Sequence, residues 1–165
     1  ETDLDEIIRT SVRKYARQFI AKKISLSYEP VETTVITDKK WLSFVIEQVI
    51  SNAVKYTKTG GIKIYLEDGD GTMSVPVQKA SHRKEDDGEN SGMKSVRLVI
   101  EDTGIGIRAE DLPRICEMGY TGCNGHEGQH SSGLGLYLFS RILKKLAHTF
   151  SITSKEWVGT VVKIG

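Results

Sequence analysis

The chain has 165 residues, of which 38% are hydrophobic, 27% are charged and three are proline. This composition indicates a single globular domain, and no apolar run approaches the roughly 20 residues of a membrane-spanning helix. The formal net charge of +1, from 23 basic and 22 acidic side chains, argues against a polyanionic partner such as nucleic acid.

Glycine is the residue type that departs from the average. There are 16 glycines, about 10% of the chain where about 7% is usual. Eight of them lie within residues 104–135. The two cysteines, Cys116 and Cys123, have the spacing neither of a zinc site nor of a disulfide framework. His126 and His130 stand among the glycines, where no helix would align them as metal ligands.

The beginning of the chain is predicted to contain one amphipathic helix and two short strands. Asp3 is a suitable N-cap with Glu6 three residues later, and apolar residues recur at helical spacing to about Lys22. Alternation over residues 24–28 and β-branched residues over 31–37 then predict two strands joined around Pro30.

A second helix, a strand and an irregular segment follow. Asp38 is placed to cap a helix over residues 39–55, which is apolar around most of its circumference. After the Gly60-Gly61 turn, residues 62–66 alternate as a strand. Residues 67–95 are rich in glycine, serine and mixed charge, so they are predicted to form a flexible insertion.

The remaining pattern completes the expected fold class. It predicts a strand over residues 96–100, a short helix over 109–115, a helix over 136–147, and two closing strands over 149–154 and 159–164. Helices and strands mix without a regular βαβ alternation. We therefore expect an α+β fold, a two-layer sandwich in which a mixed sheet of about five strands carries three main helices on one face.

Four polar residues form one stripe on the otherwise apolar helix 39–55: Gln48, Asn52, Lys55 and Tyr56. Such a stripe either faces solvent or lines a pocket. In a pocket, the amide oxygens of Gln48 and Asn52 suit Mg²⁺, which takes oxygen ligands and shares the remaining positions with water and substrate phosphates. Lys55 would then be placed to reach a phosphate as a point charge.

A carboxylate follows the strand 96–100, in Asp102-Thr103-Gly104-Ile105-Gly106. Gly104 and Gly106 have no Cβ, so a flat ligand is able to approach the backbone there. The Asp102 carboxylate accepts hydrogen bonds and donates none, so it favours the exocyclic amine of adenine over the carbonyl of guanine. Taken alone, the same residues also fit an ordinary turn.

The sequence Ser131-Ser132-Gly133-Leu134-Gly135-Leu136 places a Gly-x-Gly before the last predicted helix. Unpaired N–H groups at a helix N-terminus bind anions, and glycine lets a phosphate come within hydrogen-bonding distance of them. A lone Gly-x-Gly is weak support. Neither a Rossmann GxGxxG after a first strand nor a Walker Gly-Lys-Ser/Thr is present.

Together and in this order, the three motifs resemble the N box, G1 box and G2 box of the GHKL ATPase superfamily. Asn52-Ala53-Val54-Lys55-Tyr56-Thr57, residues 102–107 and residues 132–136 are similar to the boxes of the catalytic and ATP-binding domain, of Bergerat fold, of bacterial sensor histidine kinases. The resemblance covers nearly the whole chain apart from 67–95. The segment that begins at Tyr120-Thr121-Gly122 resembles the subgroup that senses cell-envelope attack by peptide antibiotics.

The resemblance implies roles for individual residues. Asn52 would hold Mg²⁺ with help from Gln48, Lys55 would contact phosphate, and Tyr56 would cover the nucleotide. Asp102 would bind the adenine amine of ATP, with Thr160 assisting through water. The base pocket would be shaped by Gly104 and Gly106, and further nucleotide contacts would come from Ile107, Tyr120, Thr121, Ser132, Gly133, Leu134, Gly135 and Leu136.

The same resemblance places an ATP lid over residues 117–132. Cys116 stands where the family usually carries Phe, whereas Tyr120 retains the second aromatic of that segment. No Lys or Arg occurs between Arg114 and Arg141, so the cation that commonly contacts phosphate from the lid is missing, and His126 or His130 would substitute in part. Because glycines make the lid easy to bend, we expect it to be mobile without nucleotide.

The resemblance also limits the reaction. Superfamily members that hydrolyse ATP on their own carry a glutamate where Gln48 stands, and the neighbouring Glu47 is rotated by about 100° around the helix. We therefore expect the domain to bind Mg-ATP but to hydrolyse it poorly. A kinase avoids wasteful hydrolysis in this way, because the nucleophile is a protein imidazole instead of water.

The expected partners follow from the same argument. No histidine of the chain lies in a family-like acceptor context, so the acceptor is expected on a histidine-bearing dimerisation domain outside it, with a response regulator downstream and a homodimeric full-length kinase. The chain would be the cytoplasmic piece of a bacterial cell-membrane protein. Three alternatives remain open: a protein-serine kinase of the anti-sigma type, a GHKL ATPase clamp, and a nucleotide-binding module without catalysis.

Overall fold

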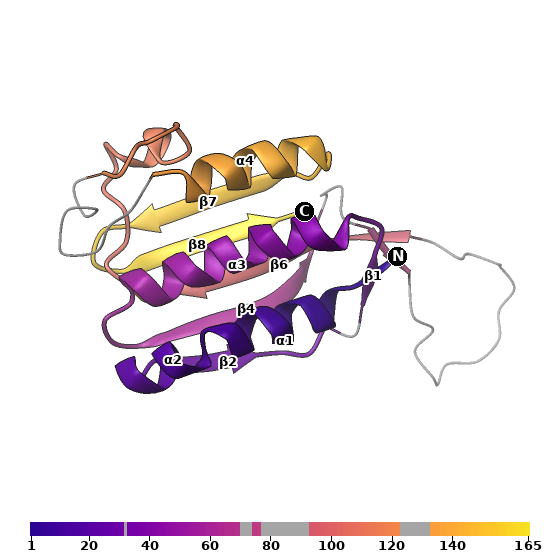
Figure 1. Cartoon of the computed structure of the whole chain (residues 1–165), viewed down its shortest axis with the longest axis horizontal. Coiled ribbons are helices and arrows are strands. Elements are labelled where there is room, and N and C mark those ends of the chain that lie inside the picture. Colours follow the sequence, from indigo (N-terminus) through magenta and orange to yellow (C-terminus); the bar gives the residue numbers. More distant parts are fainter. Residues whose placement is uncertain (32, 70–73, 77–92, 123–132) are drawn as a thin grey trace, which may run out of the picture.

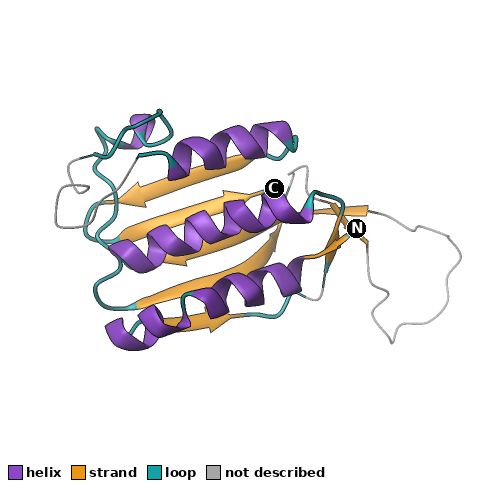
Figure 2. Cartoon of the chain, viewed as in Figure 1, coloured by secondary structure: helices purple, strands orange, loops and turns teal. Residues whose placement is uncertain are grey.

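The helices of the molecule lie together on one face of its sheet (Figure 1). The computed structural model describes residues 1–31, 33–69, 74–76, 93–122 and 133–165. Its helices are α1 (Leu4–Lys14), α2 (Ala16–Lys22), α3 (Lys39–Tyr56) and α4 (Gly135–Lys145). Figure 2 shows the two layers, helices in front and strands behind. This confirms the expected α+β sandwich.

The sheet is mixed, as expected. Its main path runs in the order β2 (Ser25–Tyr28), β4 (Gly61–Asp68), β6 (Met93–Asp102), β8 (Gly159–Ile164) and β7 (Phe150–Lys155). The β2–β4 pair is parallel and the other pairs of this path are antiparallel. In this register Asp102, the last residue of β6, lies opposite Ile62 on one side and Thr160 on the other.

The hydrophobic core lies between α1, α3 and α4 and the inner face of the sheet. Helix α3 contributes most to it, because seven of its residues are buried around several faces of the helix. The strands contribute alternate residues, so Ile62 and Ile64 point inward while Lys63 is exposed. Each fully buried aliphatic side chain of this kind stabilises the fold by about 1.5–3 kcal/mol relative to an exposed one.

Polar contacts hold both ends of α3, the helix that carries the predicted polar stripe. At its start, the Asp38 carboxylate accepts a hydrogen bond from the backbone of Trp41 at 3.1 Å, as the sequence predicts. At its end, the Lys22 ammonium donates to the carbonyl oxygens of Val54 at 2.6 Å and Lys55 at 3.0 Å. A cation at this position is favourable because the helix dipole places partial negative charge there.

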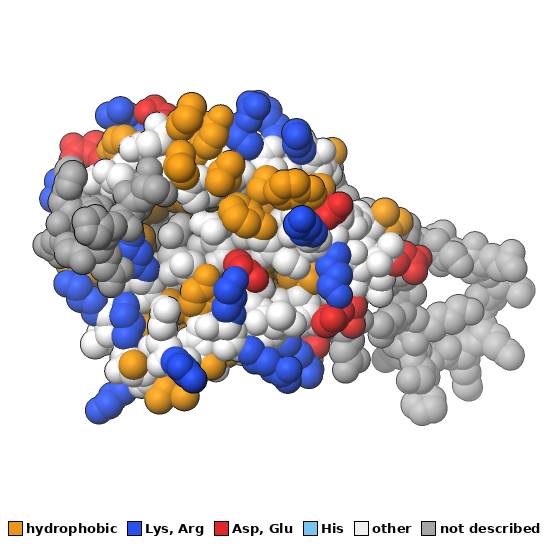
Figure 3. Space-filling model, viewed as in Figure 1, with side chains coloured by type: hydrophobic (Ala, Val, Ile, Leu, Met, Phe, Trp, Pro, Cys, Tyr) orange, Lys and Arg blue, Asp and Glu red, His pale blue; other side chains and the backbone are white. Residues whose placement is uncertain are grey.

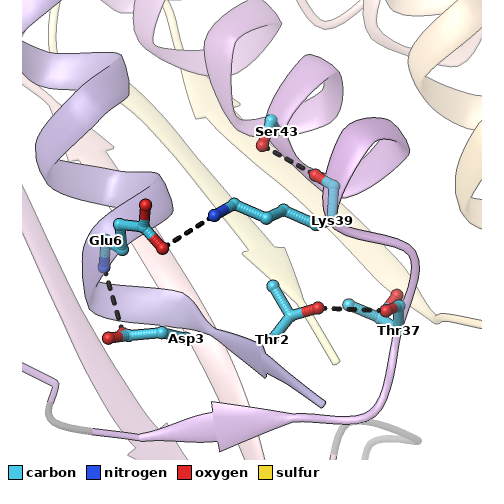
Figure 4. A network of polar contacts seen from close by, with 6 residues as sticks. All are labelled: Thr2, Asp3, Glu6, Thr37, Lys39 and Ser43. Carbon is cyan, nitrogen blue, oxygen red and sulfur yellow. Dashed lines mark hydrogen bonds and ion pairs between the residues drawn. The ribbon is translucent and has the colours of Figure 1, made fainter.

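A second set of contacts ties the start of α3 to the start of the chain (Figure 4). The Thr2 hydroxyl donates to the carbonyl oxygen of Thr37 at 3.1 Å, and Lys39 pairs with Glu6 at 2.7 Å. Asp3 caps α1 by accepting from the backbone of Glu6 at 3.1 Å. The predicted N-cap is therefore confirmed, but the Glu6 carboxylate pairs with α3 instead of closing a capping box.

Three predicted elements differ from the structure. The first helix is not continuous to Lys22, because it breaks at Tyr15, whose φ of −103° and ψ of 6° separate α1 from α2. The predicted strand over 31–37 shrinks to β3 (Thr34–Val35), which pairs with β1 (Thr2–Asp3) outside the main sheet. The predicted helix over 109–115 is one 3₁₀ turn, η1 (Leu112–Arg114).

The boundaries predicted for the 67–95 insertion are also too wide. Strand β4 continues to Asp68, β6 already begins at Met93, and a short strand β5 (Ser74–Pro76) pairs with β6 inside the segment. Hydrophobic alternation fails here because these strand ends pair by backbone hydrogen bonds while their side chains are mostly polar. Residues 70–73 and 77–92 lie outside the described part of the chain.

The surface on the helix side mixes charged and apolar side chains (Figure 3). Lysine and arginine side chains are spread over this face, and apolar side chains gather over α4. Trp41 of α3 and Leu138 of α4 are 48% and 40% exposed. Among the described residues, no helix has both the length and the apolar character needed to cross a membrane.

Candidate functional site

A cavity of about 410 Å³ opens where the C-terminal half of α3, the ends of β6 and β8, the 106–122 segment and the start of α4 meet. It brings together most of the residues selected from the sequence. Those that line it are Gln48, Asn52, Lys55, Tyr56, Asp102, Gly106, Ile107, Tyr120, Thr121, Gly133, Gly135, Leu136 and Thr160. Gly104 and Leu134 are not among its lining residues, and Ser132 lies outside the described residues.

Asp102 provides a fixed carboxylate at one end of the cavity. Burial raises the pKa of this carboxyl, and hydrogen bonds from the backbone N–H groups of Gly104 and Thr160 oppose that rise. The bond from Gly104 measures 2.8 Å. Beside it, the Thr160 hydroxyl lies 2.8 Å from the Ser154 hydroxyl. The carboxylate is thus held in one orientation before any ligand binds, which suits it to accept a hydrogen bond from a ligand donor.

The two glycines after Asp102 are required by the protein itself. A Cβ on Gly104 would lie 2.7 Å from the Tyr56 carbonyl oxygen, and one on Gly106 would lie 2.1 Å from the Lys155 carbonyl oxygen. Gly106 also has a φ of +69°, which side-chain-bearing residues rarely adopt. The sequence suggested that these positions are glycine so that a flat ligand can approach. Close backbone packing is a further reason, because it already excludes a side chain at both positions.

The polar stripe of α3 lines the cavity, which decides between the two interpretations left open by the sequence. Gln48, Asn52, Lys55 and Tyr56 all border it. The Lys55 ammonium lies 5.0 Å from the centre of the Tyr56 ring, within the range of a cation–π contact. The described residues hold no cluster of three His, Cys, Asp or Glu side chains arranged for a metal. The side-chain amides of Gln48 and Asn52 offer neutral oxygen donors to a metal ion in the cavity.

Glu47 is turned away from the cavity. Its carboxylate accepts a hydrogen bond from the Lys14 ammonium of α1 at 2.6 Å, and it is not among the lining residues. This carboxylate raises the pKa of Lys14. This exposed contact joins α3 to α1, whereas the next residue, Gln48, borders the cavity.

The start of α4 forms another part of the cavity wall. Gly133, with a φ of +68°, accepts a hydrogen bond from the backbone of Gly119 at 3.1 Å, and α4 begins at Gly135. Leu134 at the N-cap supplies no side-chain hydrogen bond to the first turn. The dipole of the helix places partial positive charge at this end, which favours an anion there.

Other lining residues were not selected from the sequence. They are Val49, Ser51, Ala53, Asp111, Ile115, Gly122, Ile152 and Val162. Inward alternation along β7 and β8 was the available signal for Ile152 and Val162. The sequence contained no such signal for Asp111, because this residue lies in a segment predicted as an ordinary short helix. Within the predicted lid, residues 123–132, with both candidate histidines, lie outside the described part.

The sequence profile described as "Histidine kinase-, DNA gyrase B-, and HSP90-like ATPase" matches residues 37–165. Sensor histidine kinase YxdK of Bacillus subtilis is 32% identical over 164 residues, which cover 97% of this chain and 43% of YxdK. Sensor protein BceS of Halalkalibacterium halodurans is 30% identical over 97% of the chain and 41% of its own length. Sensor protein kinase GraS of Staphylococcus aureus is 33% identical over 81% of the chain and 32% of its own length. The chain thus spans less than half of each relative.

Solved structures agree with the fold. The catalytic domain of histidine kinase ThkA superposes with a TM-score of 0.71 at 20% identity, covering 99% of this chain and 91% of that domain. Full-length ShkA, solved in complex with AMPPNP, gives a TM-score of 0.71 at 19% identity, covering 99% of this chain and 29% of ShkA.

Proposed function

Since the chain belongs to the family of histidine kinase-, DNA gyrase B- and HSP90-like ATPases, we propose that its cavity binds Mg-ATP for transfer of the γ-phosphoryl group to a histidine of another domain. The observation that carries the proposal is the single cavity wall that joins Asp102, Asn52 and the start of α4. A base-selective acceptor, oxygen donors for a cation and an anion-binding helix end are thereby combined in one site.

The base binds at the Asp102 end. An acceptor-only carboxylate pairs with the amine of adenine and is repelled by the carbonyl of guanine. The backbone N–H of Gly104 fixes this carboxylate at 2.8 Å, so little ordering is needed when the base arrives. Ile107 and Ile152, which border the same cavity, supply apolar surface for the ring faces.

The phosphates bind between α3 and α4. Asn52, with Gln48, holds Mg²⁺, which neutralises phosphate charge and keeps part of its water shell. Lys55 lines the cavity about one turn after Asn52 and contributes a further positive charge. The N–H groups at the start of α4 receive phosphate oxygens. In the transfer, the bond from the γ-phosphorus to its bridging oxygen breaks, a bond to the imidazole nitrogen forms, and ADP leaves.

Hydrolysis by this domain alone is slow. Gln48 is unable to take a proton from water, and the Glu47 carboxylate is engaged by Lys14 at 2.6 Å outside the cavity. A substantial ATPase rate that Glu47→Ala abolishes would contradict this part of the proposal.

The partners lie beyond this chain. The curated relatives are named sensor kinases, and the chain spans 32–43% of YxdK and GraS. We infer that the acceptor is a histidine-bearing dimerisation domain of the same kinase, that the full-length protein is a homodimer anchored in the bacterial membrane, and that a response regulator acts downstream. The exposed apolar side chains Trp41 and Leu138 offer a surface of the kind that another domain covers.

Binding of ATP with and without Mg²⁺, followed by isothermal calorimetry, tests the site. Asn52→Ala is expected to weaken binding with Mg²⁺ by about tenfold or more, because it removes a metal ligand contributing a few kcal/mol. Binding without Mg²⁺ should change little. Ser43→Ala is the matched control, since Ser43 lies on α3, donates to the Lys39 carbonyl and is not among the cavity's lining residues. Equal Mg²⁺ dependence in both variants would refute the role of Asn52.

Transfer is tested by adding a histidine-bearing dimerisation domain in trans with labelled ATP. The label is expected on that domain and is expected to be lost in acid, as phosphohistidine is. An acid-stable label on a supplied protein substrate would favour the alternative protein-serine kinase instead.

A further inference from the structure

A buried carboxylate stands in the cavity wall without a part in the proposed function. Asp111 is 7% exposed, precedes η1 and borders the cavity.

The Asp111 side chain contacts Tyr120, an aromatic residue that neighbouring residues also hold in place. Its carboxylate accepts a hydrogen bond from the Tyr120 hydroxyl, which comes from the other end of the 111–120 segment. The Arg114 guanidinium covers the face of the same ring, 4.4 Å from its centre, and the Arg114 Nε is 3.2 Å from the Glu117 carboxylate. The backbone of Tyr120 donates to the Glu117 carbonyl oxygen at 3.3 Å. The ring is therefore held at its hydroxyl, at one face and at its backbone.

The two aromatic side chains among the described lining residues are supported differently. Tyr56 is the last residue of α3, whose backbone hydrogen bonds fix its position. Tyr120 lies in an irregular segment, between η1 and Gly122. A loop side chain that is ordered only by its ligand consumes part of the binding free energy. The Asp111 bond orders Tyr120 in advance.

We propose that Asp111 is a positioning residue that fixes the Tyr120 ring as a preformed wall of the nucleotide cavity. This inference rests on the proposed function, because it concerns the affinity of the same site for Mg-ATP. It assigns to Asp111 an effect on binding that acts through Tyr120 and needs no contact between Asp111 and the nucleotide.

A double-mutant cycle on the full chain separates action through Tyr120 from direct contact. Removal of a hydrogen bond to a charged group predicts that Tyr120→Phe and Asp111→Ala each weaken Mg-ATP binding about fivefold. If the two residues act as one unit, the double variant also binds about fivefold more weakly, because the second change removes nothing further. Asp111→Asn keeps an acceptor for the tyrosine hydroxyl, so it should stay within about twofold of the unmodified chain.

Tyr65→Phe is the matched control. The Tyr65 hydroxyl donates to the Glu101 carboxylate at 3.1 Å, and neither residue lines the cavity. Its removal costs a tyrosine–carboxylate bond of the same kind and should leave Mg-ATP affinity unchanged. Melting temperatures without nucleotide report any general loss of stability. If Asp111→Ala does not fold, Tyr120→Phe, Asp111→Asn and their combination carry the test.

Each possible result of these measurements either supports or overturns the proposal. An effect of the double variant equal to the product of the single ones, about 25-fold by additivity of free energies, would overturn the proposal in favour of direct contact with the nucleotide. Unchanged affinity in Tyr120→Phe, or a loss no larger than that of Tyr65→Phe, would also overturn it. Failure of the unmodified chain to bind Mg-ATP would instead refute the proposed function, so the two failures are distinguishable.

Discussion

The cavity is bordered by two glycine-containing turns that differ in what excludes a side chain. After β6, a Cβ on Gly106 would meet the Lys155 carbonyl oxygen at 2.1 Å, and both groups belong to the backbone. At the start of α4, a Cβ on Gly135 would meet the Gln48 side-chain oxygen at 2.4 Å, at the free end of a flexible side chain. The first glycine therefore serves the fold, whereas the second serves a residue of the proposed phosphate site.

The two parts of the cavity wall therefore differ in how easily their atoms can shift to accept a substitution. The proposed base end is built from strand ends that are restricted by their register and by close backbone packing. At the proposed phosphate end, the amide of the flexible Gln48 side chain lies against the start of α4, so it is able to move without unfolding the protein. Stability measurements and binding measurements should thus respond differently at the two ends.

The largest expected effect is on stability at the base end. Gly106→Ala combines a left-handed backbone conformation with a backbone clash, and should lower the free energy of unfolding by about 2–5 kcal/mol. Urea denaturation measures it. Gly119→Ala is the matched control, because Gly119 has a φ of +76° but a Cβ there would meet nothing within 4 Å. A Gly119→Ala variant as unstable as Gly106→Ala would show that the clash is not the cause.

Asp102→Asn should separate binding from stability at the same end. It should weaken ATP binding by about 30-fold or more, since a charged hydrogen bond to a ligand contributes up to about 3 kcal/mol. Burial raises the pKa of Asp102, so the folded state disfavours the charged carboxylate. Below the ordinary carboxyl pKa the variant and the unmodified chain should be similarly stable.

As the pH rises through the raised pKa, the unmodified chain loses stability that the uncharged Asn does not lose. The variant should therefore melt at an equal or higher temperature at neutral pH, as measured by calorimetry at several pH values. A variant that melts lower at neutral pH, or one that keeps its affinity for ATP, would contradict this account of Asp102.

The smallest effect on stability is expected at the phosphate end. Gly135→Ala replaces glycine by a better helix former and displaces the Gln48 amide, so the free energy of unfolding should change by less than about 1 kcal/mol. Mg-ATP affinity should fall as it does in Gln48→Ala, and the double variant should match the single ones. If Gly135→Ala weakens Mg-ATP binding further in a chain that already carries Gln48→Ala, then its effect on affinity does not act through Gln48.

Much of the fold and of the site was predictable from local patterns. The caps Asp3 and Asp38, the alternation along β4, β6 and β8, and the Gly-x-Gly at the start of α4 are short-range signals, and the elements they predict are present. The break at Tyr15 and the pairing of β3 with β1 were not predictable, because nothing within a few residues distinguishes them from a continuous helix or a sheet strand.

By itself, the sequence determined the order of the motifs, the class of fold and the residue types that meet at the cavity, because periodicity and special backbone conformations are local properties. Only the tertiary structure decided which side chains face each other. In the structure, the polar stripe of α3 lines the cavity, Glu47 pairs with Lys14, and the Asp111 carboxylate accepts a hydrogen bond from Tyr120. These contacts depend on how separate elements pack, which follows from the shape of the whole core and not from any one segment.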